Sequence, residues 1–188
     1  MKDDSVTLGK MTLKVLGWYL AVDFMMFFIN LPFTRLVTST SADGNVTVPR
    51  VIPCVILGAF TLLIDFGLTV GYMGPVGEKV HSPFSEAPVD RWLALKAAAI
   101  VFALPLLFSA FTALTGAGVF LNTNFYEAMR FPHNVFYGPV FGFLLAFYQK
   151  SWLTPFFPPL IMICVVELSY WLVVIKRVKL PKIFYRDR

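Results

Sequence analysis

Four long stretches of this chain each contain at most one charged or histidine side chain, and this feature limits the possible folds more than any other. Polar or charged residues bound the stretches, which run from Lys14 to Arg35, from Arg50 to Glu78, from Lys96 to Asn122 and from Lys150 to Lys176. Each stretch can supply the ~20 apolar residues that an α-helix needs to cross a ~30 Å hydrocarbon core. The chain therefore contains four candidate membrane spans.

The composition supports the same conclusion. Of the 188 residues, 57% are hydrophobic and 14% are charged. Soluble domains carry about 25% charged residues, because these residues cover their surface in water. A lipid bilayer is therefore the expected surroundings of this chain, which we expect to be one integral membrane domain, residues 1–188.

Backbone polar groups inside a bilayer must be paired within the protein, which leaves helices or closed barrels as spanning structures. Apolar stretches of this length favour helices. The sequence thus predicts an all-α, polytopic transmembrane helical bundle. Its four spans are expected at about 13–34, 51–73, 97–121 and 155–176, with an irregular inner loop from Gly74 to Leu95.

The segment 131–149 is ambiguous. It has no formally charged side chain, but its continuous apolar part is short for a crossing and contains Gly138, Pro139 and Gly142. Runs of that length are typical of re-entrant, interfacial or core segments. We expect this segment to be a short re-entrant or interfacial hydrophobic addition to the four spans.

The basic residues favour one orientation. If 131–149 does not cross, the outer loops hold Arg35, Arg50, Arg130 and Lys150, and the other twelve of the 16 Lys and Arg residues lie inside. An excess of Lys and Arg on the cytoplasmic side is the usual pattern in membrane proteins. The sequence therefore predicts both termini in the cytoplasm and, as the setting, the plasma membrane of a bacterium. No nucleic-acid-binding motif accompanies the net charge of +5.

No recognised catalytic or metal-binding motif is present. His81 and His133 are the only histidines, and neither has a metal-ligand spacing. We therefore expect no catalytic residues, no metal, no cofactor and no enzymatic activity. A membrane enzyme acting on lipid is the alternative, and its only candidate cluster is Glu78, His81, Glu86, Asp90 and Arg91 in the inner loop. The pairs Gly67-x-x-x-Gly71 and Gly138-x-x-x-Gly142 match a common small-residue helix-packing pattern.

Three acids are the informative residues. Asp23, Asp65 and Glu167 each lie alone inside a different span. A charged acid at the bilayer centre costs at least ~2.5–3.5 kcal/mol, so such residues usually face the interior of the bundle and serve a function. With a rise of ~1.5 Å per residue, the three carboxylates are expected at one level near the midplane, as one intramembrane polar cluster.

Helical periodicity supports that cluster. Thr61, Asp65 and Thr69 share one face of the second span, and Asn30 shares a face with Asp23. Tyr170 lies one turn from Glu167 on the last span. Two interpretations remain open, because the carboxyls could bind a proton or cation, or could form structural hydrogen bonds with neighbouring helices.

Two functions follow from these interpretations. The first is a non-enzymatic component of a transport or ion-handling system, in which the acids bind a cation or proton. The second is a structural or accessory subunit of a larger membrane complex, in which the acids pair with a partner. Partner membrane subunits or further copies of this chain are the protein partners that these functions imply.

Overall fold

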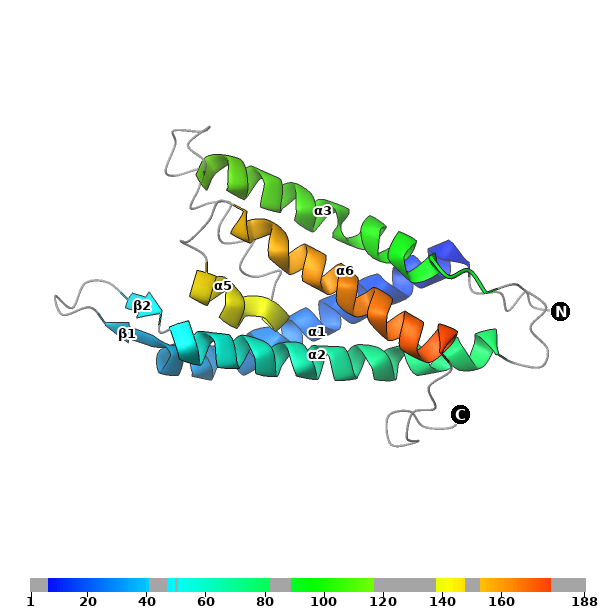
Figure 1. Ribbon diagram of the computed structural model, residues 1–188, viewed down its shortest axis with the longest axis horizontal. Coiled ribbons are helices and arrows are strands. Elements are labelled where there is room, and N and C mark those ends of the chain that lie inside the picture. The colour runs from blue at the N-terminus through cyan, green and yellow to red at the C-terminus, as the bar shows by residue number, and fades with distance from the viewer. Residues whose placement is uncertain are drawn as a thin grey trace. The chain divides into compact units, whose positions relative to one another are not determined.

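The computed structural model of the chain describes residues 7–40, 47–49, 51–81, 89–116, 138–147 and 153–176. The elements are, in chain order, α1 (Leu8–Val37), β1 (Thr38–Thr40), β2 (Thr47–Pro49), α2 (Val51–Val80), α3 (Leu93–Gly116), the 3₁₀ turn η1 (Gly138–Val140), α5 (Phe141–Phe147), the 3₁₀ turn η2 (Thr154–Phe156), α6 (Phe157–Tyr170) and the π-helical turn η3 (Trp171–Ile175). Figure 1 shows these elements in sequence colours. The all-α prediction is confirmed.

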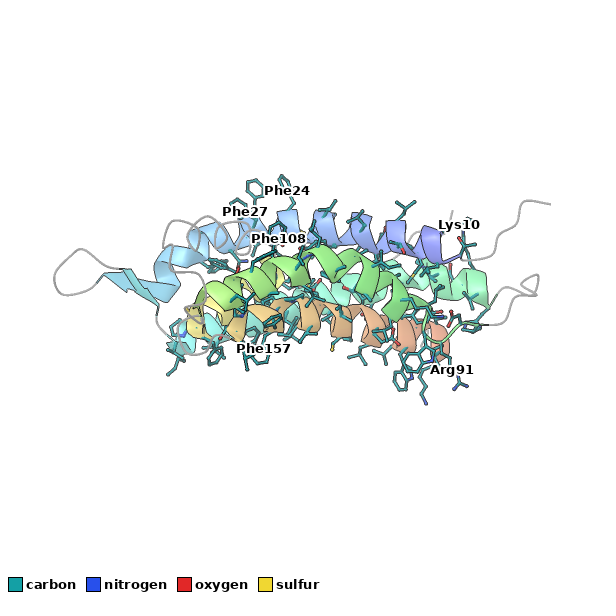
Figure 2. The ribbon with its side chains drawn as sticks, turned by 90° about the horizontal axis from the view of Figure 1, so that it is seen from above. Lys10, Phe24, Phe27, Arg91, Phe108 and Phe157 are labelled. Carbon is teal, nitrogen blue, oxygen red and sulfur yellow. The ribbon has the colours of Figure 1, made fainter. Side chains whose placement is uncertain are left out.

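Four helical stretches are long and apolar enough to cross a membrane: Leu8–Asn30, Val51–Val80, Leu93–Leu114 and Thr154–Ile175. They overlap the four predicted spans. By helix length and composition, the chain is a polytopic integral membrane protein, whose apolar helix surfaces suit contact with lipid. Aromatic side chains such as Phe24 and Phe157 project from the helices toward the surroundings (Figure 2).

Several helix boundaries differ from the prediction. α3 begins at Leu93 rather than near residue 97, and the predicted end of the third span, residues 117–121, lies outside the described residues. α1 continues to Val37 rather than ending near residue 34. α1 begins at Leu8 rather than near residue 13, and α2 continues to Val80 rather than ending near Met73. The predicted loop from Gly74 to Leu95 is therefore partly helical. Charged residues mark where a helix leaves the hydrocarbon, but the helix itself continues into water because Lys and Glu are good helix formers.

Proline positions explain two helix starts. α2 has Pro53 in its first turn, and η2 places Pro155 at the beginning of the last helical stretch. A first-turn residue needs no intrahelical N–H partner, so proline is tolerated there.

β1 and β2 form a short antiparallel hairpin between α1 and α2, in which Thr38 pairs with Pro49.

The described contacts group the chain into two compact units, each considered by itself below. The first unit comprises Met1–Tyr19, Asp65–Phe102 and Ile161–Arg188. The second comprises Leu20–Ile64 and Ala103–Leu160.

In the first unit, the ends of α2 and of the last helix lie against each other. A Cβ atom added at Gly77 would come within 2.9 Å of Val173. The His81 ring forms a hydrogen bond with the backbone carbonyl of Val174 at 2.5 Å. His81 is therefore held in a structural contact between the two helix ends.

In the second unit, the residues from Gly138 to Phe147 form a short broken helix, called here the re-entrant segment. It consists of η1, whose three residues are all buried, followed by the seven residues of α5. Seven helical residues rise only ~10 Å, far less than a bilayer core. The prediction of a short additional segment is confirmed for these residues, whereas 131–137 and 148–149 lie outside the described residues.

Candidate functional site

Asp23 lies near the middle of α1, and its side chain is only 7% exposed. Its Oδ1 atom accepts a hydrogen bond of 2.8 Å from the backbone N–H of Gly138, the first residue of the re-entrant segment. The carboxylate therefore binds the N–H group at the very start of this segment, where a helix has no N–H partner of its own.

Asn30 binds the carbonyl group of Gly138. It lies seven positions after Asp23, two helical turns further along the same face of α1. Its Nδ2 atom donates a hydrogen bond of 2.7 Å to the carbonyl oxygen of Gly138. Both polar groups of the Gly138 backbone are thus paired with buried side chains of α1.

Thr61 of α2 holds the next residue. Its hydroxyl lies 2.6 Å from the carbonyl oxygen of Pro139 and donates a hydrogen bond to it. The same hydroxyl is also near the carbonyl oxygens of Leu57 and Gly58, at 2.9 and 3.2 Å. Because a hydroxyl has one proton, these acceptors share it, and Pro139 provides the shortest contact.

We call Asp23, Asn30 and Thr61 the polar clamp. The sequence predicted these three residues as part of a polar cluster, but did not predict that their partner is the backbone of Gly138 and Pro139. Irregular backbone at membrane depth is tolerated only where it is buried against protein or lines a water-filled cavity. The polar clamp satisfies that requirement with side chains from two helices.

Glycines bring the re-entrant segment close to α2. A Cβ atom added at Gly142 would collide with the Cys54 carbonyl and the Gly58 backbone nitrogen, and one added at Gly58 would lie 2.7 Å from the Phe143 ring. The expectation that Gly138-x-x-x-Gly142 marks close packing is confirmed for both glycines, because a Cβ atom added at Gly138 would lie 2.9 Å from the Asp23 carbonyl oxygen. Gly67, from the other predicted pair, has no atom within 4 Å of an added Cβ.

Apolar packing completes the contact between α2 and the segment. Cys54, Leu57 and Ala146 form a buried cluster, with Val55 packed at its edge. The segment's end is fixed as well, because the Thr154 hydroxyl donates to the carbonyl oxygen of Phe147 at 3.2 Å.

Asp65 and Thr69 belong to the first unit, and both are fully buried in α2. The Thr69 hydroxyl donates to the backbone carbonyl of Asp65 at 2.7 Å and lies 3.5 Å from the Asp65 Oδ1 atom. This pair, four residues apart, shares one helix face as the sequence indicated.

Glu167 and Tyr170 also belong to the first unit, and they contact the beginning of α3. The Glu167 carboxylate accepts a hydrogen bond from the backbone N–H of Leu95, and the Tyr170 hydroxyl donates to the carbonyl oxygen of Asp90 at 2.8 Å. The first N–H groups of a helix have no intrahelical partner, so a carboxylate there is a natural acceptor. Glu167 therefore lies beside the first turn of α3, and its depth relative to the other two acids stays a prediction.

Asp90 completes this helix start. Its Oδ1 atom accepts from the Trp92 N–H at 2.9 Å, and its Oδ2 atom lies 2.9 Å from the Lys96 ammonium. These hydrogen bonds, that from Lys96 above all, hold the pKa of Asp90 below its ordinary value of 3.8. Asp90 and Lys96 are both exposed, so the ion pair is a surface feature.

The sequence-predicted residues thus fall into three groups. The polar clamp brings together Asp23, Asn30 and Thr61, α2 pairs Asp65 with Thr69, and the last helix carries Glu167. The clustering of all three acids stays a prediction, because Asp23 and the other two acids belong to different units. Across the described ranges, no group of three or more His, Cys, Asp or Glu side chains could hold a metal ion.

Comparisons of the chain with protein-family models, with curated protein sequences and with solved structures found no significant match. The geometry of these side chains therefore carries the functional argument.

Proposed function

We propose that this protein is a non-enzymatic membrane component of a transport or ion-handling system, in which the Asp23 carboxylate binds the transported proton or cation. The observation that carries this proposal is the placement of a buried acid, near the middle of a membrane-length helix, on the backbone of a re-entrant segment. Binding sites in membrane transporters are commonly built where helices are interrupted.

The choice of an acid supports this function over a purely structural one. Asn30 and Thr61 bind the neighbouring backbone groups with neutral side chains. An amide oxygen at residue 23 would accept the same bond from Gly138 without the cost of an ionisable group, ~2.5–3.5 kcal/mol at the bilayer centre. What the carboxylate adds is the ability to exchange a proton or to bind a cation.

Flux measurements in liposomes test this proposal. The purified chain is reconstituted with an entrapped indicator dye, and proton, sodium and potassium gradients are imposed separately. The wild-type protein should carry at least one ion, and Asp23→Asn should lose most of the flux while keeping the Gly138 hydrogen bond. Asp90→Asn, which changes an exposed acid, is the matched control and should keep the flux. Wild-type flux equal to that of empty liposomes under all three gradients, or full flux in Asp23→Asn, would overturn the proposal.

An accessory subunit of a larger membrane complex is the second candidate. The feature that favours it is an aromatic face on α1, where Phe24, Phe27 and Phe28 are exposed and pack edge to face, with ring centroids 4.8 and 5.7 Å apart. Figure 2 shows Phe24 and Phe27 projecting away from the helix. Such a face suits a partner helix as well as lipid.

Expression of the chain alone separates the two candidates. A transport protein should purify in detergent as a stable monomer or homo-oligomer. An accessory subunit should aggregate or be degraded without its partner, and Phe24→Ala should then weaken its recovery with that partner.

The proposed function includes an orientation. The distribution of basic residues supports a bacterial plasma membrane with both termini in the cytoplasm. Reporter fusions at residue 188 and in the loop before β2 test this orientation. If the reporter at residue 188 is accessible only from outside the cell, the segment 131–149 crosses the membrane and the orientation is wrong.

A further inference from the structure

Two lysines of the first unit share a surface where α1 lies beside α2. The Lys14 ammonium sits over the Tyr72 ring, 4.8 Å from its centroid. The charge of Lys79 also acts on Lys14, by Coulomb repulsion. Lys79 lies seven residues after Tyr72, two turns further along the same face of α2.

The acids that the structure describes do not neutralise this pair. Neither Lys14 nor Lys79 forms a salt bridge with a carboxylate in the part of the chain that the structure describes. By contrast, Lys96 of the same unit is paired with Asp90 at 2.9 Å. Two like charges that repel each other, with no carboxylate partner among the described residues, favour binding of an anion.

The depth of the pair indicates the source of that anion. α1 has 30 residues and is therefore ~45 Å long, ~15 Å longer than a ~30 Å hydrocarbon core. Lys14 lies six residues, or ~9 Å, from the beginning of α1, near the boundary between hydrocarbon and head groups. Tyr72 is partly exposed, as expected for an aromatic ring at this boundary.

We propose that Lys14 and Lys79 bind the phosphate group of an anionic phospholipid. The Tyr72 ring holds the Lys14 ammonium in position by a cation–π contact. Basic pockets between membrane helices are a known way to bind anionic lipid head groups. Lys10 lies one turn before Lys14 on the same face of α1, and Figure 2 shows it at the end of that helix. The site is thus continuous with the basic end of the helix.

The test measures binding of fluorescent phosphatidylglycerol to the purified full chain in a neutral detergent. Lys14→Gln and Lys79→Gln should each weaken binding about fivefold, the factor that corresponds to ~1 kcal/mol per lysine near a membrane surface. Lys96→Gln removes the same charge from the same unit, but its ammonium is already neutralised, so binding should stay within about twofold. Lys14→Arg should keep the affinity.

Two further arms identify the ligand. Phosphatidylcholine, which carries the same phosphate beside a cation, should bind more weakly than phosphatidylglycerol. Sodium phosphate at the same concentration should not displace the lipid. The proposal fails if both Gln variants bind like the wild type, if Lys96→Gln loses as much as they do, or if free phosphate competes equally. Lipid binding is measured without any flux, so its result is independent of the transport proposal.

Discussion

The Asp23 carboxylate and the Gly138 amide are joined by a 2.8 Å hydrogen bond, although 115 positions separate them in the sequence. A buried N–H without an acceptor is costly, and the cost is highest where water is absent. This bond, with those from Asn30 and Thr61, explains how a short irregular segment can lie among apolar helices.

Replacing Asp23 separates its role as an acceptor from its role as an acid. Asp23→Ala leaves the Gly138 N–H unpaired and should destabilise the docked segment by ~1–3 kcal/mol. Asp23→Asn keeps an oxygen acceptor and should change the docking little. The readout is alkylation of Cys54, which is buried in the cluster with Ala146, relative to the exposed Cys164 in the same molecule. Equal Cys54 labelling in wild type and Asp23→Ala would contradict this account.

Gly142→Ala should be strongly destabilising. The new Cβ atom would meet the Cys54 carbonyl and the Gly58 nitrogen, and backbone atoms of a helix cannot move aside cheaply. We expect the protein's thermal unfolding temperature in detergent to fall and Cys54 to become reactive. Gly17→Ala is the control, because an added Cβ there has no atom within 4 Å and alanine favours a helix by up to ~1 kcal/mol. A normal unfolding temperature for Gly142→Ala would show that this close contact is absent.

Thr61→Val removes a donor without changing the side-chain shape much. The carbonyl of Pro139 would lose its 2.6 Å partner, and a loss of ~0.6–1.7 kcal/mol is typical of such bonds between membrane helices. Cys54 labelling should therefore rise modestly. Thr69→Val is the matched control, since Thr69 is equally buried in α2 but donates to Asp65 of its own helix. If both variants raise Cys54 labelling equally, the bond to Pro139 is not what holds the segment.

The Asp90–Lys96 pair predicts an effect of acid. The folded-state pKa of Asp90 is lowered, so its contribution to stability is present above the ordinary value of 3.8 and is lost as the pH falls through the folded value. Lys96→Met removes the main cause, and the pKa of Asp90 should rise toward 3.8. Titration of the Asp90 carboxyl by NMR measures this directly. An unchanged titration in Lys96→Met would assign the lowered pKa to the Trp92 N–H instead.

The sequence predicts the spans well because hydrocarbon thickness imposes a minimum apolar length, which the pattern of charges displays. It predicts the helix ends less well. Lys10, Glu78 and Lys79 lie inside helices, because a charge ends the buried part of a helix and not the helix itself. The positions of Lys14 and Tyr72 on facing helices depend on packing that no local pattern contains.

Part of the polar clamp could have been predicted from the sequence. Asp23, Asn30 and Thr61 stand out as buried polar residues, and Gly138 with Pro139 stands out as a helix interruption. Irregular backbone in a membrane needs polar partners, so the two observations could have been joined. Helical periodicity describes each helix alone, so it did not identify the Gly138 backbone as the partner of Asp23. The contact of Glu167 with Leu95 could not be foreseen, since it depends on where α3 begins.

The polar clamp also has a consequence for biosynthesis. Every side chain in it comes from α1 or α2, and the glycine that the segment approaches most closely, Gly58, is also in α2. A ribosome releases these two helices well before it reaches Gly138. The newly made segment therefore meets partners that are already in place, and its irregular backbone need not remain unpaired while the last span is still being synthesised.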